Sequence, residues 1–184
     1  MSTPSIFEAA RQMRLSTRAQ ACLRPSMAAR SAVQTLLDAG HSADALSLLG
    51  RLLPRRYAVA WACQCCRRQS LDEHDRAGLE LAEAWVRDPM EAQRAAALAF
   101  AKTHRYQTIG AWTAAAAGWS GGNLNPEHER PTPPPEHLTA IAATAAVSYM
   151  AALVPARFDA RRAAFVRDAL GLLSVPEGSD GGMQ

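Results

Sequence analysis

The sequence predicts an all-α protein that folds as a single compact bundle of about eight helices. Apolar residues recur at every third or fourth position through most of the 184 residues, which is the period of an amphipathic helix. Proline and glycine stand where this periodicity breaks, and no stretch alternates with period two for long enough to form a sheet. HEAT-like or solenoid-like stacking of helical hairpins is the alternative architecture, although no residue pattern repeats at a fixed spacing.

Length and composition favour one domain. Hydrophobic residues make up 48% of the chain and charged residues 20%, which is ordinary for a globular protein. We expect a short helix and connector in residues 1–25 and the helical domain in residues 26–174. Residues 175–184 are rich in glycine and are expected to form a disordered tail.

The helices of the N-terminal half follow from their end signals. Residues 6–15 predict one short helix, and residues 16–25 a connector. A helix from residue 26 onwards is expected to end before Gly40, which suits a left-handed cap. Ser42 is the expected N-cap of the next helix, and Pro54 the first residue of the one after.

The middle of the chain predicts one central helix and two capped ones. Residues 57–66 contain a single polar residue, which predicts a helix buried on nearly all sides. The pattern from Ser70 to Glu73 predicts a capping box at the start of the following helix. Asp88, followed by proline and by Glu91, predicts the start of another. Small residues in 92–101 predict close packing against a neighbouring helix.

Two nearly uncharged alanine-rich helices, 109–117 and 138–154, are expected to pack as a hairpin around a long loop. The second is apolar enough to suggest a membrane span, but it is shorter than the ~20 residues that crossing needs, and alanine dominates it. We therefore expect no membrane insertion. A last helix is predicted over residues 157–173.

The charge distribution is uneven although the net charge is only +3. Ten arginines and three acids in residues 1–68 give +7, whereas six basic and ten acidic residues in 69–138 give −4. The N-terminus lacks the apolar core of a signal peptide, so a cytoplasmic location is expected. One function to weigh is a nucleic-acid-associated regulator, with phosphates bound by a basic patch. The candidate residues are Arg51, Arg55, Arg56, Arg67 and Arg68.

No catalytic, metal or cofactor motif is found. Cys63 and Cys65 point ~160° apart on a helix, so only Cys63 and Cys66 could share a metal, and buried core thiols are the better interpretation. The trio of Glu73, His74 and Asp75 fits the acidic first turn of a capped helix. We therefore expect no enzyme, no metal and no cofactor. An enzyme that uses His128 and His137, with Glu127 and Glu129, is the remaining alternative.

The loop at residues 119–136 is the one feature that helix packing does not explain. Trp112 and Trp119 lie seven residues apart, so they share a helix face, and Trp119 is expected at the helix exit. Glycine can then turn the chain, and the proline run is expected to be extended. One interpretation is that Trp119 and Leu124 simply pin the loop onto the bundle. The other is partner binding, because loops of this length in compact domains are usually functional or disordered. The expected partner-binding residues are Trp112, Trp119, Gly121, Gly122, Asn123, Leu124, Pro133 and Pro134.

Several short motifs carry a family resemblance. They are residues 55–63 (RRYAVAWAC), 84–89 (AWVRDP), 118–124 (GWSGGNL) and 137–140 (HLTA). Over residues 26–173 the chain resembles an uncharacterised family of small bacterial helical proteins found near type VI secretion genes. The resemblance implies an accessory role, as an adaptor, chaperone or assembly factor, and it supplies no catalytic residues. The leading hypothesis is a non-enzymatic cytoplasmic protein that binds another protein.

Overall fold

The computed structural model of the protein describes residues 4–124, 130 and 132–174. Within these ranges the regular structure consists of ten α-helices and two 3-10 helices, without a strand. The predicted all-α fold is therefore confirmed. The tail at 175–184 lies outside the described residues.

The helices follow the chain in the order of their numbers. The first five are α1 Ile6–Gln12, α2 Thr17–Ala21, α3 Ala29–Asp38, α4 Ser42–Leu52 and α5 Arg55–Arg67. The next five are α6 Glu73–Arg87, α7 Glu91–Thr103, α8 Ile109–Gly118, α9 Leu138–Ala152 and α10 Phe158–Ala169. The 3-10 helices are η1 Pro155–Arg157 and η2 Leu170–Ser174.

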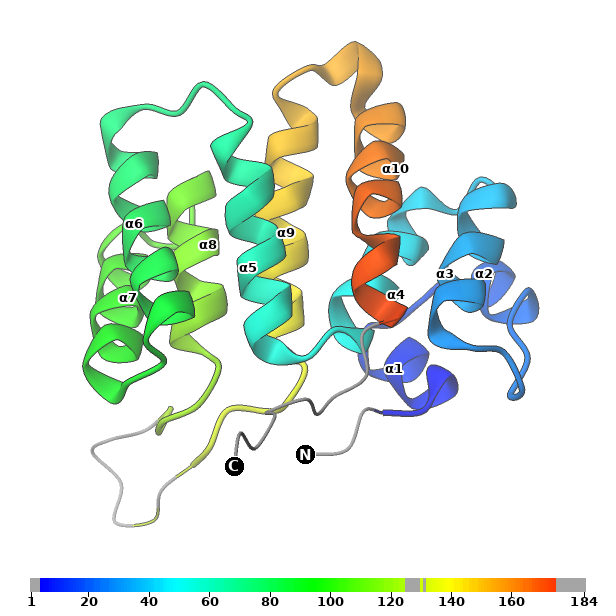
Figure 1. Ribbon diagram of the computed structural model, residues 1–184, viewed down its shortest axis with the longest axis horizontal. Helices are drawn as coiled ribbons and strands as arrows, with labels where there is room; N and C mark the ends of the chain where they lie inside the picture. The colour runs from blue at the N-terminus through cyan, green and yellow to red at the C-terminus, as the bar shows by residue number, and fades with distance from the viewer. Residues whose placement is uncertain (1–3, 125–129, 131, 175–184) are drawn as a thin grey trace, which may run out of the picture.

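The C-terminal helices close the bundle. In Figure 1, α6, α7 and α8 form one end, α1 to α4 form the other, and α5, α9 and α10 stand between them. Helix α9 packs on α4, α5 and α8. Helix α10 packs on α4, from which it is separated by more than one hundred residues of sequence. A solenoid repeat contacts only its sequence neighbours. The molecule is thus a compact bundle rather than a solenoid.

Small residues bring α6 and α8 into backbone contact. Helix α8 is buried on all sides except at Trp112, as its apolar sequence predicts. A Cβ atom on Gly78 of α6 would lie 2.4 Å from the carbonyl oxygen of Gly110 on α8. Such an approach is possible only where both helices lack side chains. The closest packing therefore involves these glycines as well as the small residues predicted in α7.

The N-terminal half differs from the prediction at several helix starts: α3 begins at Ala29 and not at residue 26, and Pro54 is the N-cap of α5 and not its first helical residue. The expected connector contains the short helix α2, because the Ser16 hydroxyl caps it by accepting from Ala19 N–H at 3.2 Å. Ser42 is the first helical residue of α4, and His41 is its N-cap. The Ser42 hydroxyl instead accepts hydrogen bonds from Arg162 of α10. Gly40 has a φ of +78°, which confirms the predicted left-handed cap.

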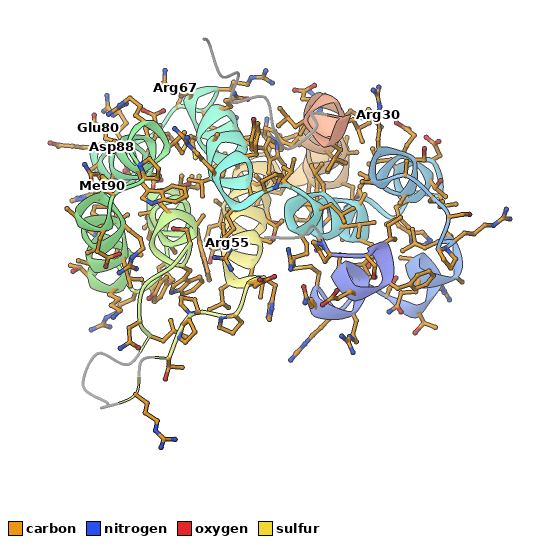
Figure 2. All side chains as sticks on the ribbon, turned by 60° about the horizontal axis from the view of Figure 1, so that its bottom comes forward. Arg30, Arg55, Arg67, Glu80, Asp88 and Met90 are labelled. Carbon is orange, nitrogen blue, oxygen red and sulfur yellow. The ribbon has the colours of Figure 1, made fainter. Side chains whose placement is uncertain are left out.

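Two further helix starts lie downstream of their predicted caps. Asp72, and not Ser70, caps α6, with its carboxylate accepting from Asp75 N–H at 2.7 Å. Asp88 ends α6, and α7 begins at Glu91 after the N-cap Met90. Figure 2 shows Asp88 and Met90 together at this corner. In both cases the helix begins within three residues of the prediction.

In the described ranges, no single helix is both long enough and apolar enough to span a membrane. Residues Leu138–Ala152 and Pro155–Leu173 satisfy them only when taken together, and the two segments are bent by 114° at their junction.

Candidate partner-binding site

Three aromatic rings form a cluster at the base of the loop. Trp119 is the C-cap of α8, and its ring packs edge-on against Trp112 with centroids 6.2 Å apart. The predicted shared face is confirmed. Tyr106 adds a third ring, stacked on Trp119 at 5.3 Å and tilted against Trp112 at 5.6 Å. All three side chains are half-buried, and we call them the aromatic cluster.

Tyr106 comes from the turn between α7 and α8. Arg105 and Tyr106 have φ values of 52° and 56°, in the left-handed region that non-glycine residues seldom adopt. Their N–H groups bond back to α7, from Tyr106 to Ala101 at 3.1 Å and from Arg105 to Lys102 at 3.0 Å. Burial raises the pKa of the Tyr106 hydroxyl. The sequence gives no sign that this turn, which lies between the predicted segments 92–101 and 109–117, supplies a ring to the cluster.

A buried arginine holds the start of the loop. Arg94 of α7 donates from Nη1 to the Gly118 carbonyl at 2.5 Å. Its Nε and Nη2 donate to the two carboxylate oxygens of Glu91 at 2.7 and 2.6 Å. The hydrogen bonds from Arg94 lower the pKa of Glu91, and those to Glu91 raise the pKa of Arg94. A bidentate pair of this kind fixes the guanidinium in one orientation.

Gly122 lies directly on this guanidinium. Its φ is +81°, and a Cβ atom there would lie 2.4 Å from Cζ of Arg94. Gly121 makes only ordinary contact, since a Cβ would be 3.9 Å from Cδ of Arg94. Of the two predicted turn glycines, Gly122 is therefore the one that the local structure requires. The sequence did not indicate Arg94, because a single arginine in an alanine-rich helix matches no binding motif.

The α4–α5 corner holds both flanks of the loop. Arg55 donates from Nη1 to the Ser120 carbonyl at 2.8 Å, at the entry to the loop. Arg51, which is 8% exposed, forms an ion pair with Glu136 at 3.1 Å, at the loop exit, and also donates to Gln12 of α1. In Figure 1 the described flanks of the loop run along one edge of the bundle, beyond the ends of α8 and α9.

Hydrogen bonds join the entry and the exit of the loop within its described residues. Leu124 N–H donates to the Thr132 carbonyl at 2.8 Å, and Thr132 N–H donates to Oδ1 of Asn123 at 2.8 Å. Pro133 is exposed and Pro134 is buried. Residues 125–129 and 131, which include His128, Glu127 and Glu129, lie outside the described residues. The predicted site residues from Trp112 to Leu124 thus share one region, and the prolines lie in the segment that leads from the loop to α9.

The five arginines of the predicted basic patch do not gather at one place. Arg55 and Arg67 lie at opposite ends of α5, as Figure 2 shows, about 18 Å apart along the helix. Arg56 donates to the Val86 carbonyl at 2.8 Å, and Arg68 pairs with Asp168 at 2.5 Å. Arg67 pairs with Glu83 of the acidic helix α6. Each of the five has an intramolecular acceptor.

The cysteines of α5 are core residues. Cys63, Cys65 and Cys66 are buried, and burial is the main cause that raises the pKa of each thiol, to about 12 for Cys65 and Cys66. Cys66 lies 3.2 Å from the Thr113 hydroxyl of α8. Among the described residues no group of three histidine, cysteine or acidic side chains could hold a metal. Thiols that stay protonated are poor ligands and nucleophiles.

Asp75 of the charged trio has a structural role. Its carboxylate accepts from Gly110 N–H at 2.7 Å and so supports the first turn of α8. His74 lies near His104, with ring centroids 5.8 Å apart. This arrangement explains Asp75 through helix packing alone.

Fold and site together define a small helical protein built around one anchored loop. Residues 32–173 match a family of unknown function (DUF6931), and the chain belongs to this family. No curated protein and no solved structure matches the chain.

Proposed function

We propose that the protein is a non-enzymatic adaptor, chaperone or accessory protein that binds a protein partner at the aromatic cluster and the adjoining loop. Its setting would be the bacterial cytoplasm, in association with type VI secretion, as the family resemblance implies. The proposal is carried by one observation: three half-buried rings lie at the base of a loop whose flanks are bonded to three arginines of the bundle.

The chemistry of the cluster suits protein recognition. Tryptophan, tyrosine and arginine are the residues most enriched among those that dominate interface energies. The indole N–H of Trp112 is buried without a hydrogen-bond acceptor. Because this atom has no exposed surface, a partner would contact the exposed part of the rings and not the indole N–H. A binding loop on a rigid scaffold also loses little conformational freedom when it binds.

The test compares a half-buried ring of the aromatic cluster with an exposed ring elsewhere on the surface. Trp119→Leu removes most of the stacking surface on Tyr106 but keeps an apolar contact. Tyr149→Ser is the matched control, because Tyr149 on α9 is 44% exposed and has no part in the loop. Each variant and the wild type would be used to capture proteins from a lysate of the source organism, with identification by mass spectrometry.

We expect a protein that wild type and Tyr149→Ser retain equally and that Trp119→Leu retains at least tenfold less. Circular dichroism should show that all three proteins are folded. Recovery of the same set of proteins with all three would contradict the proposal. Loss of the fold in Trp119→Leu would instead assign the cluster to stability, in which case Pro133→Ser, at an exposed position, becomes the test variant.

The alternative, a nucleic-acid-associated regulator, has weaker support because the five arginines are dispersed and engaged. Duplex DNA binding at low salt that weakens steeply as salt rises would favour it. Arg67→Gln combined with Arg68→Gln would have to reduce that binding. No retention on DNA at low salt would remove this alternative.

A further inference from the structure

Exposed apolar side chains gather at one place on the molecule, the turn between α9 and α10. Among the residues that the structure describes, six large apolar side chains are exposed. Three of them stand singly on α1, α5 and the α6–α7 corner, which is normal for a protein surface. The other three lie close together at the end of α9, and they are Tyr149, Leu153 and Val154, which are 44%, 51% and 38% exposed. A contiguous apolar patch, unlike single residues, marks a surface that interacts.

The chain around Leu153 and Val154 adds to this surface. Residues 152–157 are all exposed, and all of them except Arg157 are apolar. We call Tyr149 together with residues 152–156 the apolar tip. In Figure 1 the turn between α9 and α10 is the topmost part of the bundle, at the end opposite to the described flanks of the loop. The apolar tip is therefore a protruding surface, whereas a site for a small molecule is concave.

The residue types of the apolar tip suit lipid better than protein. Leucine and valine are under-represented among the residues that dominate protein interfaces, where tryptophan, tyrosine and arginine prevail. Aliphatic side chains on a protruding turn can instead enter the boundary between headgroups and acyl chains, and their binding strength grows with the apolar area that they bury there. Tyrosine is typical of this boundary. Tyr149 lies four residues before Leu153 and so shares its face of α9.

The backbone at the apolar tip is also suited to an apolar medium. An unpaired N–H group costs several kcal/mol in hydrocarbon, on the order of a lost hydrogen bond. Leu153 N–H donates to the Met150 carbonyl at 3.3 Å, and Val154 N–H donates to the Ala151 carbonyl at 3.4 Å. Pro155 has no N–H group. The donors of these three residues are therefore paired or absent before the tip contacts lipid.

Arginines accompany the apolar tip. Residues 149–162 hold three arginines and one acid, Asp159, which gives a net charge of +2. Arg157 is exposed, and its side chain has no partner within the part of the chain that the structure describes. Figure 1 shows α5 between this hairpin and the acidic helix α6. The charge at the tip therefore complements anionic lipid headgroups, to which each arginine near the surface adds attraction.

We propose that the apolar tip docks the protein on the surface of a membrane that contains anionic lipids, with Leu153 and Val154 at the acyl-chain boundary and Arg157 among the headgroup phosphates. Helix α9 stays buried in the bundle, so this contact is not a transmembrane span. The fifteen residues of α9 separate the tip from the loop exit by about 22 Å. The docked protein therefore keeps its loop on the side away from the membrane.

The experiment is co-sedimentation of the purified protein with lipid vesicles, at low salt and at rising sodium chloride. One set of vesicles contains phosphatidylcholine alone, and the other contains an equimolar mixture of phosphatidylcholine and phosphatidylglycerol. Wild type is compared with Arg157→Gln and with the double variant of Leu153→Ser and Val154→Ser, which changes only exposed side chains. Met90→Ser is the matched control, because Met90 is an exposed apolar residue at the α6–α7 corner.

We expect wild type and Met90→Ser to bind the anionic vesicles equally, and to bind phosphatidylcholine vesicles at least tenfold less. The double variant should bind the anionic vesicles at least tenfold more weakly than wild type, because the inserted apolar area is lost. Arg157→Gln should bind about fivefold more weakly, and rising salt should weaken binding of wild type. Circular dichroism should show that all variants are folded.

Wild type that stays in the supernatant with anionic vesicles at low salt would overturn the proposal, as would equal sedimentation of wild type and the double variant. If wild type ignores vesicles but self-associates in sedimentation velocity, and the double variant does not, the apolar tip is an interface between two copies of the chain and the proposal is wrong. Trp119→Leu should bind vesicles as wild type does. Failure here and failure of the partner hypothesis are therefore distinguishable.

Discussion

Two glycines in this molecule have equally close neighbours, one in the helical core and one in the loop. A Cβ on Gly110 would lie 2.5 Å from the Asp75 carbonyl oxygen, and one on Gly122 would lie 2.4 Å from Arg94 Cζ. The first contact joins the backbones of α6 and α8. The second rests a loop on the tip of a long side chain. The core contact cannot yield, whereas the loop contact depends on hydrogen bonds that can be exchanged.

The first contact stabilises the fold, whereas the second positions the loop on the surface of the bundle. Around Gly110 the neighbours are helical backbone, and the packed core has no room to move. Around Gly122 the loop is held by three arginines on α4, α5 and α7. Changes in the first region should therefore affect the whole fold. Changes in the second should affect the loop and leave the bundle intact.

The largest effect is expected at the helix contact. Gly110→Ala forces α6 and α8 apart, and we expect a loss of more than about 3 kcal/mol in the free energy of unfolding, measured by urea denaturation. Gly171→Ala is the control, since nothing lies within 4 Å of its Cβ position, and it should change stability by less than about 1 kcal/mol. Equal stabilities of the two variants would contradict the rigid contact.

The core should also be sensitive to alkaline pH. Folding raises the pKa of Cys66 from 9.0 to about 12, so between these values the unfolded chain loses a proton that the native protein keeps. Stability then falls as pH rises, by about 1.4 kcal/mol per pH unit for one thiol. Cys66→Ala should show a correspondingly smaller slope in urea unfolding between pH 9 and 11. Its packing loss is read at pH 7 as a constant offset, and identical slopes would refute the assignment.

The sequence predicted most of the core because helix periodicity is local. The predicted helices were found, as were the shared face of Trp112 and Trp119 and the buried thiols. Helix starts were less accurate, because capping rules consider only sequence neighbours. The Ser42 hydroxyl bonds Arg162, which lies 120 positions away, so tertiary structure and not the local cap sets its role.

The loop base was predicted only in part, and the reason is again distance along the chain. The loop is bonded to Arg94, Arg55 and Arg51, which come from three different helices. These contacts depend on how α4, α5, α7 and α8 pack, and sequence neighbours do not reveal that packing. The basic patch was predicted from closeness of the arginines along the chain. A thirteen-residue helix nevertheless places Arg55 and Arg67 at opposite ends. Tyr106 reaches the aromatic cluster through a left-handed turn, which the sequence does not predict because neither Arg105 nor Tyr106 is a glycine.

An intermediate effect is expected at the loop contact. Gly122→Ala adds backbone strain and displaces the Arg94 guanidinium, and we expect a loss of about 2–3 kcal/mol. Gly40→Ala isolates the strain, because Gly40 has a φ of +78° with nothing within 4 Å, and should cost about 1–2 kcal/mol. Gly121→Ala should be nearly neutral. Thermal unfolding of the three variants would test this order, and a Gly122→Ala loss no larger than that of Gly40→Ala would show that the guanidinium can move freely.

The smallest effect concerns acid pH at the same anchor. Hydrogen bonds from Arg94 lower the pKa of Glu91, so the native protein keeps the carboxylate ionised at pH values where the unfolded chain binds a proton. Stability from this pair is present above the ordinary carboxyl pKa of 4.5 and is lost as pH falls through the lowered value. Because the Glu91 side chain is 70% exposed, the contribution should stay below about 1 kcal/mol.

Glu91→Gln sharpens the contrast between the two regions. Its stability should lie below that of wild type at pH 7, and the two should converge as pH falls below the carboxyl range, in urea denaturation at constant ionic strength. Gln keeps the side-chain length, so the difference reports the charge. The Cys66 slope operates above pH 9 and the Glu91 difference only near and above pH 4.5, because the core is stabilised by excluding charge and the loop base by pairing it. A difference that persisted unchanged at low pH would mean that the amide itself, and not the loss of the charge, lowers the stability. Equal stabilities at pH 7 would mean that Arg94 holds the loop through Gly118 alone.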